Sequence, residues 1–333
     1  MRCPDCGVVQ KNEKEHQCRC GYQFILHAHS SQGMTDAKFL DVLQRAHQNG
    51  RFYCTFAQLY TAWCQYNAVE NLARLRKKLI AFSVFWVIFV TNCTLLWGWA
   101  GGVLSLVLLI GPWLLLRKYR RQHPPELGQL KKLVKQWQVG HGGGDEMLLL
   151  RPSLEEPPAG FQEKEVVDYG VERIILVERP LLVDLLVKNA FHAEQNALIF
   201  SQDGYPSFIV RCARKILREN KSLPVYLLHD ASEAGRGMCQ RIKLSGRRVI
   251  DLGIRPEHIE KMQFLDALQL EKKGYKAPLD ILPYPVLAAL CGQAFREEST
   301  FSEVLEQWDT SRAQESLFCC TGRKKKKRGR EEK

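Results

Sequence analysis

The feature that most constrains this chain is a long segment without charge. From Leu79 to Leu116 the sequence contains no Asp, Glu, Lys, Arg or His. A single helix over this segment would be about 57 Å long, nearly twice the thickness of the hydrocarbon core of a membrane. Glycines at positions 98, 101 and 102 lie near its middle. The pattern therefore predicts a two-span transmembrane hairpin over residues 79–116, with a very short turn between the two helices.

Basic residues flank this segment on both sides. They are Arg74, Arg76, Lys77 and Lys78 before it, and Arg117, Lys118, Arg120 and Arg121 after it. Because positively charged flanks stay on the cytoplasmic side, both termini are expected in the cytoplasm. The expected location is the membrane, with the chain as an integral protein of two spans.

Four of the twelve cysteines lie within the first twenty residues. Cys3 and Cys6 form a CxxC pair, Cys18 and Cys20 form a CxC pair, and a glycine follows each pair. Thiolates on such tight turns can point at one metal ion. The pattern predicts a zinc ribbon over residues 1–24 with a structural Zn²⁺, and His16 is an alternative ligand to Cys18. The other cysteines are scattered, which favours a reducing compartment.

The segments on either side of the uncharged stretch are expected to be helical. Residues 35–68 predict two helices, the first after an N-cap at Thr35 and the second over FYCTFAQLYTAWCQY. They fit either a plain helical hairpin or a partial winged helix. Residues 122–164 predict one helix, about 126–138, followed by a connector rich in Gly and Pro.

A change of periodicity marks the next domain. Four short apolar runs of the buried-strand type alternate with helical segments: RIILVE (173–178), NALIF (196–200), PVYLL (224–228) and RRVIDLGI (247–254). Such alternation predicts an α/β domain with a mostly parallel sheet and helices on both faces. We place this domain over residues 165–300.

Two of the predicted strands are followed by acids. Glu178 follows the first strand, Asp230 follows the third, and Glu233 lies one turn farther on. The carboxyl ends of parallel strands meet at one edge of a sheet, and three carboxylates converging there could bind Mg²⁺. The alternative is that Asp230 only caps the next helix.

Four motifs in this domain together resemble a known family. They are ILVERPLLVDLL, QDGYPS, LPVYLLHDASEAG and VIDLGIRPEHI, and they look like the toprim domain of the type IIB topoisomerase A chain and its meiotic double-strand-break relative. The resemblance implies a toprim-like fold, with Glu178 as the general acid/base and metal-side glutamate and Asp230 as the first aspartate of a pair. Ser232 occupies the place of the second aspartate, which weakens an Mg²⁺ site, and Glu233 is the expected substitute.

The same resemblance assigns roles to three further residues. We call the end of the sheet that carries Glu178 and Asp230 the acidic edge. Gly204 and Tyr205 are expected to shape this edge, and His229 is expected either to position a phosphate or merely to pack. Catalysis would therefore depend on Glu178, Asp230 and Glu233.

The cleaving members of this family also use a tyrosine nucleophile on an upstream winged helix. The segment TFAQLYT (55–61) resembles the segment that carries it, with Thr61 at the nucleophile's place and Tyr60 just before it. Tyr60 also fits the pattern of a core aromatic. Topoisomerase chemistry is therefore not expected, and no ATPase motif or nucleotide cofactor site is evident.

The C-terminal segment, residues 321–333, is strongly basic. Residues 323–333 carry half of the net charge of +12. The residues expected to attract nucleic acid or an anionic membrane are Arg323, Lys324, Lys325, Lys326, Lys327 and Arg328. A solvated tail without a partner fits this composition equally well.

Two classes of function fit these observations. The first is a membrane-anchored, Mg²⁺-dependent enzyme that hydrolyses phosphodiesters of nucleic acid. The second is a non-catalytic scaffold whose toprim domain and zinc ribbon bind nucleic acid or a protein at the membrane. A homodimer is a further expectation.

Overall fold

The computed structural model describes residues 1–9, 17–26, 33–108, 126–142, 145–168, 170–242, 246–255 and 277–307. The chain divides into two compact units. The first comprises Met1–Ala62, Leu127–Asp266 and Leu270–Lys333, and the second comprises Trp63–Glu126 and Ala267–Gln269.

A four-stranded parallel sheet is the centre of the first unit. Its strands are β3 (Arg173–Val177), β4 (Ala197–Ser201), β5 (Val225–Leu228) and β6 (Val249–Asp251). They lie in the order β4-β3-β5-β6, and all three pairings are parallel. The prediction of a parallel α/β sheet is confirmed, because runs of β-branched and leucine residues mark buried parallel strands.

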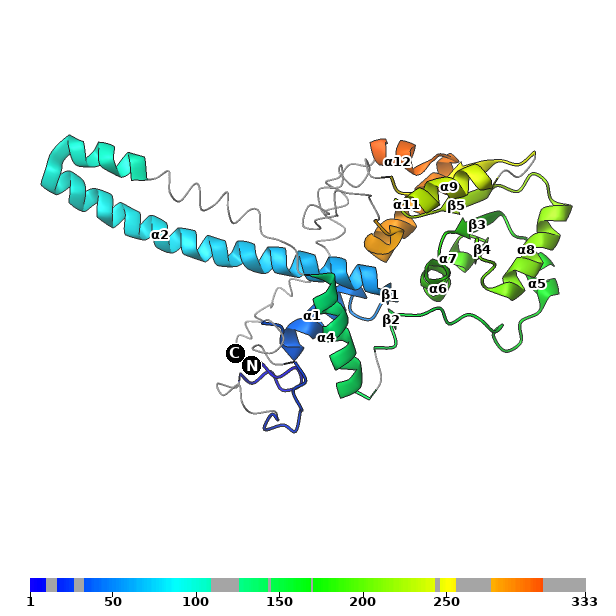
Figure 1. The fold of residues 1–333 in the computed structure, drawn as a ribbon, viewed down its shortest axis with the longest axis horizontal. Coiled ribbons are helices and arrows are strands. Elements are labelled where there is room, and N and C mark those ends of the chain that lie inside the picture. The colour runs from blue at the N-terminus through cyan, green and yellow to red at the C-terminus, as the bar shows by residue number, and fades with distance from the viewer. Residues whose placement is uncertain are drawn as a thin grey trace, which may run out of the picture. The chain divides into compact units, whose positions relative to one another are not determined.

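Short helices connect and follow these strands (Figure 1). They are α5 (Glu163–Asp168), α6 (Pro180–Lys188), α7 (Phe191–Glu194), α8 (Ser207–Glu219), α9 (Glu233–Arg241), the 3₁₀ turn η2 (Leu279–Ile281), α11 (Tyr284–Glu297) and α12 (Phe301–Gln307).

Helices pack on both faces of the sheet, as predicted. On one face, Ile174, Leu176 and Leu227 join a buried cluster with Ile216 of α8 and Met238 of α9. On the other face, the ring of Tyr226 meets that of Phe295 in α11, with ring centroids 4.5 Å apart. The alternation of side chains along each strand therefore supplies a separate apolar surface to each layer of helices.

The remainder of the first unit surrounds a small second sheet. Its elements are α1 (Asp36–Ala46), β1 (Cys54–Thr55), the start of α2 (Phe56–Leu108), α4 (Leu127–Gly140) and β2 (Leu148–Leu149), and β1 pairs in parallel with β2. The predicted N-cap at Thr35 has extended backbone but makes no side-chain capping bond. The helix α1 ends at Ala46, and Asn49 and Gly50 beyond it have positive φ, which ends the helical path of the chain.

The helix α2 differs most from the sequence prediction. It begins at Phe56 and is assigned as one helix to Leu108, whereas the prediction ended one helix at residue 68 and broke the next near Gly98. Figure 1 shows that α2 turns back on itself near its end.

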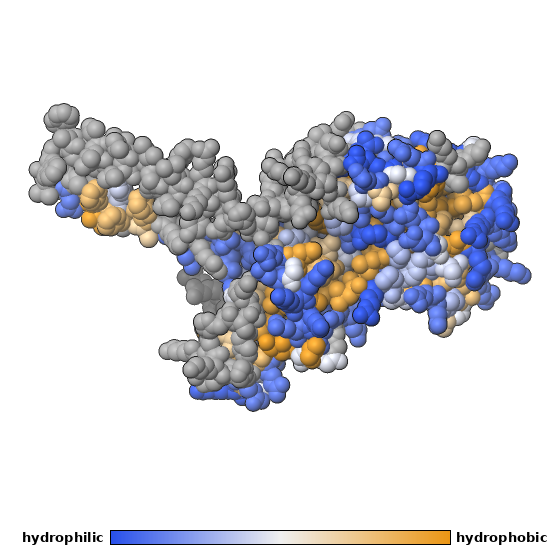
Figure 2. Space-filling model, viewed as in Figure 1, coloured by the Kyte–Doolittle hydropathy of each residue, from blue (hydrophilic) through white to orange (hydrophobic). Residues whose placement is uncertain are grey.

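The two predicted membrane spans over residues 79–116 are not supported. Within the described part of the chain, the structure contains no helix whose length and apolar character suffice to cross a membrane. Residues 109–116, which complete the second predicted span, lie outside the described residues. Apolar side chains of Ile80, Phe85 and Ile88 are nevertheless exposed on α2. Figure 2 shows hydrophobic side chains at the surface of this helix.

Asp36 fixes the N-terminal segment to α1. Its fully buried carboxylate accepts hydrogen bonds from the hydroxyl of Tyr22 (2.9 Å) and from the backbone N–H groups of Ile25 (3.0 Å) and Leu26 (2.6 Å). A buried carboxylate is tolerated when donors surround it in this way.

We expect Asp36→Ala to lower the free energy of unfolding by about 2 kcal/mol, because it leaves buried backbone donors without a partner. Denaturant unfolding of the full chain measures this loss. Asp41→Ala is the matched control, since Asp41 is exposed on the same helix. Equal, small effects of the two substitutions would contradict the role of Asp36.

Candidate functional site

Two acids meet where the central strands end. β3 and β5 are neighbours, and the backbone N–H of Glu178 donates to the carbonyl of Leu228 at 2.9 Å. The backbone N–H of Asp230 donates to Oε2 of Glu178 at 2.8 Å. Both acids are buried. The structure therefore brings Glu178 and Asp230 together at the carboxyl edge, as their positions in the sequence predict.

Ser232 completes this contact at the start of α9. Its Oγ accepts the backbone N–H of Gly235 (2.9 Å) as the N-cap of the helix, and it donates to Oε1 of Glu178 (3.3 Å). A hydroxyl can donate and accept at once, whereas an aspartate here would place a second charge beside Glu178. A Cβ at Gly235 would lie 2.9 Å from Oε2 of Glu178, so the close approach of α9 requires glycine.

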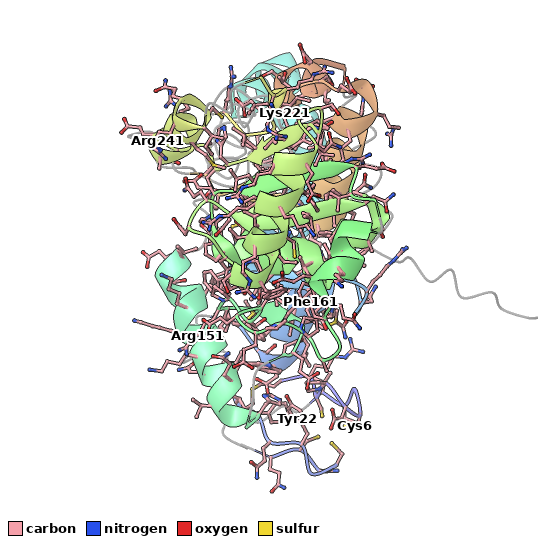
Figure 3. The ribbon with its side chains drawn as sticks, turned by 90° about the vertical axis from the view of Figure 1, so that its right-hand side faces the viewer. Cys6, Tyr22, Arg151, Phe161, Lys221 and Arg241 are labelled. Carbon is pink, nitrogen blue, oxygen red and sulfur yellow. The ribbon has the colours of Figure 1, made fainter. Side chains whose placement is uncertain are left out.

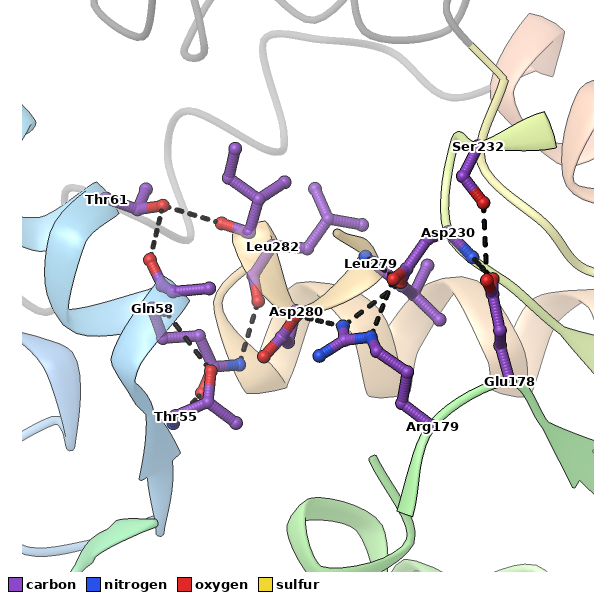
Figure 4. A network of polar contacts seen from close by, with 12 residues as sticks. Thr55, Gln58, Thr61, Glu178, Arg179, Asp230, Ser232, Leu279, Asp280 and Leu282 are labelled. Carbon is purple, nitrogen blue, oxygen red and sulfur yellow. Dashed lines mark hydrogen bonds and ion pairs between the residues drawn. The ribbon is translucent and has the colours of Figure 1, made fainter. Parts of the chain in front are cut away.

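Arg179 supplies the cation at this edge. Its Nε donates to Oδ2 of Asp230 (2.6 Å), and its Nη2 donates to Oδ1 of Asp230 (3.1 Å) and to Oδ1 of Asp280 (2.5 Å). The backbone N–H of Leu279 also donates to Oδ1 of Asp230, at 2.7 Å. Figure 4 shows the guanidinium between the two aspartates. Every carboxylate oxygen of Asp230 therefore has a protein donor.

The pKa shifts agree with this arrangement. Burial raises the pKa of Asp230, and the charge and hydrogen bonds of Arg179 oppose that rise. Burial alone would lower the pKa of Arg179, but the charges of Asp280 and Asp230 raise it further than burial lowers it. The guanidinium thus stays charged and offsets the two buried carboxylates.

Mg²⁺ does not fit these residues as the structure arranges them. The oxygens of Asp230 are bonded to Arg179 and Leu279, and those of Glu178 are bonded to Asp230 and Ser232. Glu233 is exposed on α9, and the predicted trio is not among the groups of metal-ligating atoms that lie within 4.8 Å of one another in the described residues. Mg²⁺ requires oxygen ligands in near-octahedral geometry, so it would have to displace the guanidinium that is bound to Asp230.

His229 packs behind the edge and does not line it. Its side chain is 1 % exposed, with Nδ1 2.8 Å from the carbonyl oxygen of Asp230 and Nε2 3.0 Å from Oδ1 of Asp251. Burial alone would lower the pKa of His229, but hydrogen bonds to Asp251 and Cys239 raise it to about 10. Burial would raise the pKa of Asp251, but the hydrogen bond from His229 and that from Gly253 lower it to about 2. Of the two expectations for His229, the structure favours packing.

The Gly204-Tyr205 turn belongs to another network. The hydroxyl of Tyr205 donates to Oδ1 of buried Asp184 (2.6 Å) and accepts the N–H of Leu154 (2.5 Å). Burial and the hydrogen bond to Asp184 raise the pKa of Tyr205. Gly204 has a φ of +83°, which the turn needs. Tyr205 thus fastens the connector to α6, and its hydroxyl does not reach the acidic edge.

The start of α2 contacts the segment that carries Asp280. The hydroxyl of Thr61 is 3.0 Å from the carbonyl oxygen of Ile281, and Nε2 of Gln58 donates to the carbonyl of Leu282 at 2.8 Å. Thr61 is 1 % exposed, so its hydroxyl is a buried structural donor (Figure 4). Tyr60 is partly buried on the same turn of the helix.

The four N-terminal cysteines form a second candidate site. Their Sγ atoms lie within 4.8 Å of one another, and the pairs Cys3–Cys20 and Cys6–Cys18 are each 3.6 Å apart. A tetrahedral zinc with Zn–S bonds of 2.3 Å would separate sulfurs by about 3.8 Å.

Matching turns hold these cysteines. The N–H groups of Gly7 and Gly21 donate to the carbonyls of Cys3 and Cys18, and both glycines have positive φ. Figure 3 shows Cys6 and Tyr22 in this N-terminal segment. The four thiols therefore fit one Zn²⁺. The alternative ligand His16 lies outside the described residues, as do Arg323–Arg328 of the basic tail.

Four charged partners in these networks were not predicted from the sequence: Arg179, Asp184, Asp251 and Asp280. Arg179 directly follows Glu178 in the sequence, so its position near the acidic edge could have been predicted from Glu178. Asp280 lies 101 residues beyond Arg179, and no local pattern marks their contact.

Comparison with known proteins agrees with the geometry. Residues 173–288 match the family model for the toprim domain of topoisomerase 6 A chains and Spo11. The match runs from the first residue of β3 into α11 and includes Glu178, Asp230 and Asp280. It agrees with the resemblance seen in the motifs: residues 173–288 are similar to a toprim domain of that type. No curated protein and no solved structure matches the chain significantly.

We expect Arg179→Met to lower the free energy of unfolding by about 3–5 kcal/mol, because it leaves Asp230 and Asp280 buried without their cation. The loss should shrink as the pH falls, since protonation removes the buried charge. Denaturant unfolding at several pH values measures both effects.

Arg211→Met is the control for this prediction. Arg211 forms an exposed ion pair with Glu163, and such pairs contribute about 0–1 kcal/mol. A loss for Arg179→Met that equals the control, or that does not change with pH, would contradict a charge-balancing role for Arg179.

Proposed function

We propose that the chain binds nucleic acid through its toprim domain, and that binding does not require metal-dependent cleavage. One observation carries the proposal: Arg179 holds Asp230 in bidentate geometry where a metal ion would otherwise have to bind. The acidic edge, with Glu178 and Asp230 both bonded to protein donors, then acts as a rigid part of a binding domain. The toprim match supports a role connected with nucleic acid.

A basic face on α8 is the proposed contact with phosphates. The helix buries Phe208, Cys212, Ala213 and Ile216 against the sheet and exposes Arg211, Arg214, Lys215 and Arg218. Arg211 is paired with Glu163, but within the described residues no carboxylate forms an ion pair with the other three. Figure 2 shows hydrophilic side chains along this side of the domain, and Figure 3 places Lys221 just beyond the helix. Clustered exposed cations attract the phosphate backbone regardless of sequence.

The N-terminal cysteines are proposed to hold a structural zinc. With both turns formed by glycine-assisted hydrogen bonds, the metal would fix a small ribbon that has few apolar residues of its own. The ribbon and the basic tail are then additional contacts for nucleic acid or for a protein partner.

A second candidate function is Mg²⁺-dependent phosphodiester hydrolysis. The observation in its favour is that Glu178 and Asp230 stay adjacent at the carboxyl edge. It requires that Arg179 leave Asp230, so the two functions differ in whether a divalent ion can displace the guanidinium.

We expect the α8 triple variant Arg214→Gln, Lys215→Gln, Arg218→Gln to weaken binding to duplex DNA and to reduce the slope of log K against log salt by up to about 3. Fluorescence anisotropy across a salt series measures this change. The control is Lys131→Gln, Lys132→Gln, Lys135→Gln on α4, which removes the same charge from other exposed positions. Equal effects of both variants would mean that only net charge matters, and an unchanged slope would contradict the role of α8.

We also expect calorimetric titration of the full chain with Mg²⁺ to show no saturable binding at the acidic edge, because the ion would have to displace the guanidinium of Arg179 from Asp230. Asp230→Asn is the reference variant, because any heat of Mg²⁺ binding that this variant retains must come from another site. Saturable binding in the wild type that Asp230→Asn abolishes would favour the hydrolase instead.

A further inference from the structure

A mixed group of ligand atoms lies beside the acidic edge. His229 follows β5, Cys239 lies on α9, and Asp251 ends β6. One ligand atom from each lies within 4.8 Å of the other two. The three residues come from adjacent elements of the central sheet and its covering helix, so the fold itself determines their positions.

The hydrogen bonds of His229 determine which ring nitrogen is available. Nδ1 lies 2.8 Å from the carbonyl oxygen of Asp230, which can only accept, so Nδ1 carries the proton. Nε2 then points at Oδ1 of Asp251, 3.0 Å away. In a neutral imidazole a lone pair would face a carboxylate oxygen, and this is favourable only when a cation lies between them. That cation is either a proton or a metal ion.

Two glycines hold the imidazole in place. A Cβ at Gly253 would lie 1.9 Å from Nε2, and a Cβ at Gly235 would lie 2.6 Å from Nδ1. The backbone N–H of Gly253 also donates to Oδ1 of Asp251 at 2.7 Å. Both ends of the ring and one end of the carboxylate are therefore fixed. A backbone carbonyl on the far nitrogen is the usual partner of a histidine that binds metal through the other nitrogen.

We propose that His229 Nε2, Cys239 Sγ and one carboxylate oxygen of Asp251 bind a Zn²⁺ ion. Imidazole, thiolate and carboxylate are the ligand types of zinc, whereas Mg²⁺ and Ca²⁺ prefer oxygen ligands alone. Tetrahedral zinc with bonds of 2.0–2.1 Å would separate N and O by about 3.3 Å, close to the observed 3.0 Å. Binding releases the thiol proton of Cys239 and any proton held between His229 and Asp251.

The surroundings leave the ion reachable from one side. The side chain of His229 is buried, but that of Asp251 is 25 % exposed and Cys239 is partly exposed. Arg255 lies 3.4 Å from Oδ2 of Asp251, so its contact is with the other carboxylate oxygen. Three protein ligands leave a fourth position for water or a ligand oxygen. The site is independent of nucleic-acid binding.

Zinc content of the full chain tests the proposal. The protein is stripped with a chelator under reducing conditions, reloaded with Zn²⁺, desalted and measured by elemental analysis. We expect about two zinc ions per chain, one at the N-terminal cysteines and one here. Cys239→Ser and Asp251→Asn should each lose about one, and so should the double variant Cys6→Ser, Cys20→Ser. Cys212→Ser is the control, since that cysteine is buried in α8 away from both groups and should lose none.

Alkylation of the wild-type chain gives a second readout that needs no substitution. Iodoacetamide labelling of the stripped chain, followed by peptide mapping, should modify Cys239, and Zn²⁺ should protect it. Mg²⁺ should not protect it. The proposal is overturned if Cys239→Ser and Asp251→Asn keep the wild-type zinc content, or if Cys239 is labelled equally with and without Zn²⁺. The cation between His229 and Asp251 is then a proton.

Discussion

The bond network of Arg179 joins two parts of the toprim domain that no strand connects. The guanidinium binds Asp230 at the end of β5 and Asp280 in η2, and both carboxylates are buried. A buried carboxylate is costly unless a cation or hydrogen-bond donors offset its charge. Arg179 therefore ties η2 to the end of β5, together with the hydrogen bond from the Leu279 N–H to Asp230.

The consequences extend to the start of α2. The carbonyls of Ile281 and Leu282, directly after Asp280, accept hydrogen bonds from Thr61 and Gln58. The segment that resembles the family's nucleophile-bearing helix thus contacts the acidic edge through backbone carbonyls of η2. In this arrangement the hydroxyl at the nucleophile's place is a buried donor to a backbone carbonyl.

The sequence predicted the repeating parts of the fold well and the long-range contacts poorly. All four strands of the central sheet were predicted because each is a short apolar run, and the adjacency of Glu178 and Asp230 follows from parallel strand ends. Strand order and the Arg179–Asp280 ion pair depend on residues distant in the chain, which local periodicity does not encode. The start of the helix in the uncharged stretch was predicted wrongly for a different reason: hydropathy was taken to define where the helix begins, whereas α2 already starts at Phe56.

The contacts of η2 also determine when the domain can finish folding during synthesis. Asp280 lies 101 residues after Arg179, and Leu282 lies 224 residues after Gln58. Closing loops of that length is entropically costly and slow compared with forming helices or neighbouring strand pairs. As the chain emerges from the ribosome, β3, β4 and β5 can assemble while Asp230 has Arg179 alone as its charged partner. Arg179 gains its second carboxylate partner, Asp280, only once residues 279–282 have been made. The start of α2 gains the carbonyl acceptors of Ile281 and Leu282 at the same time.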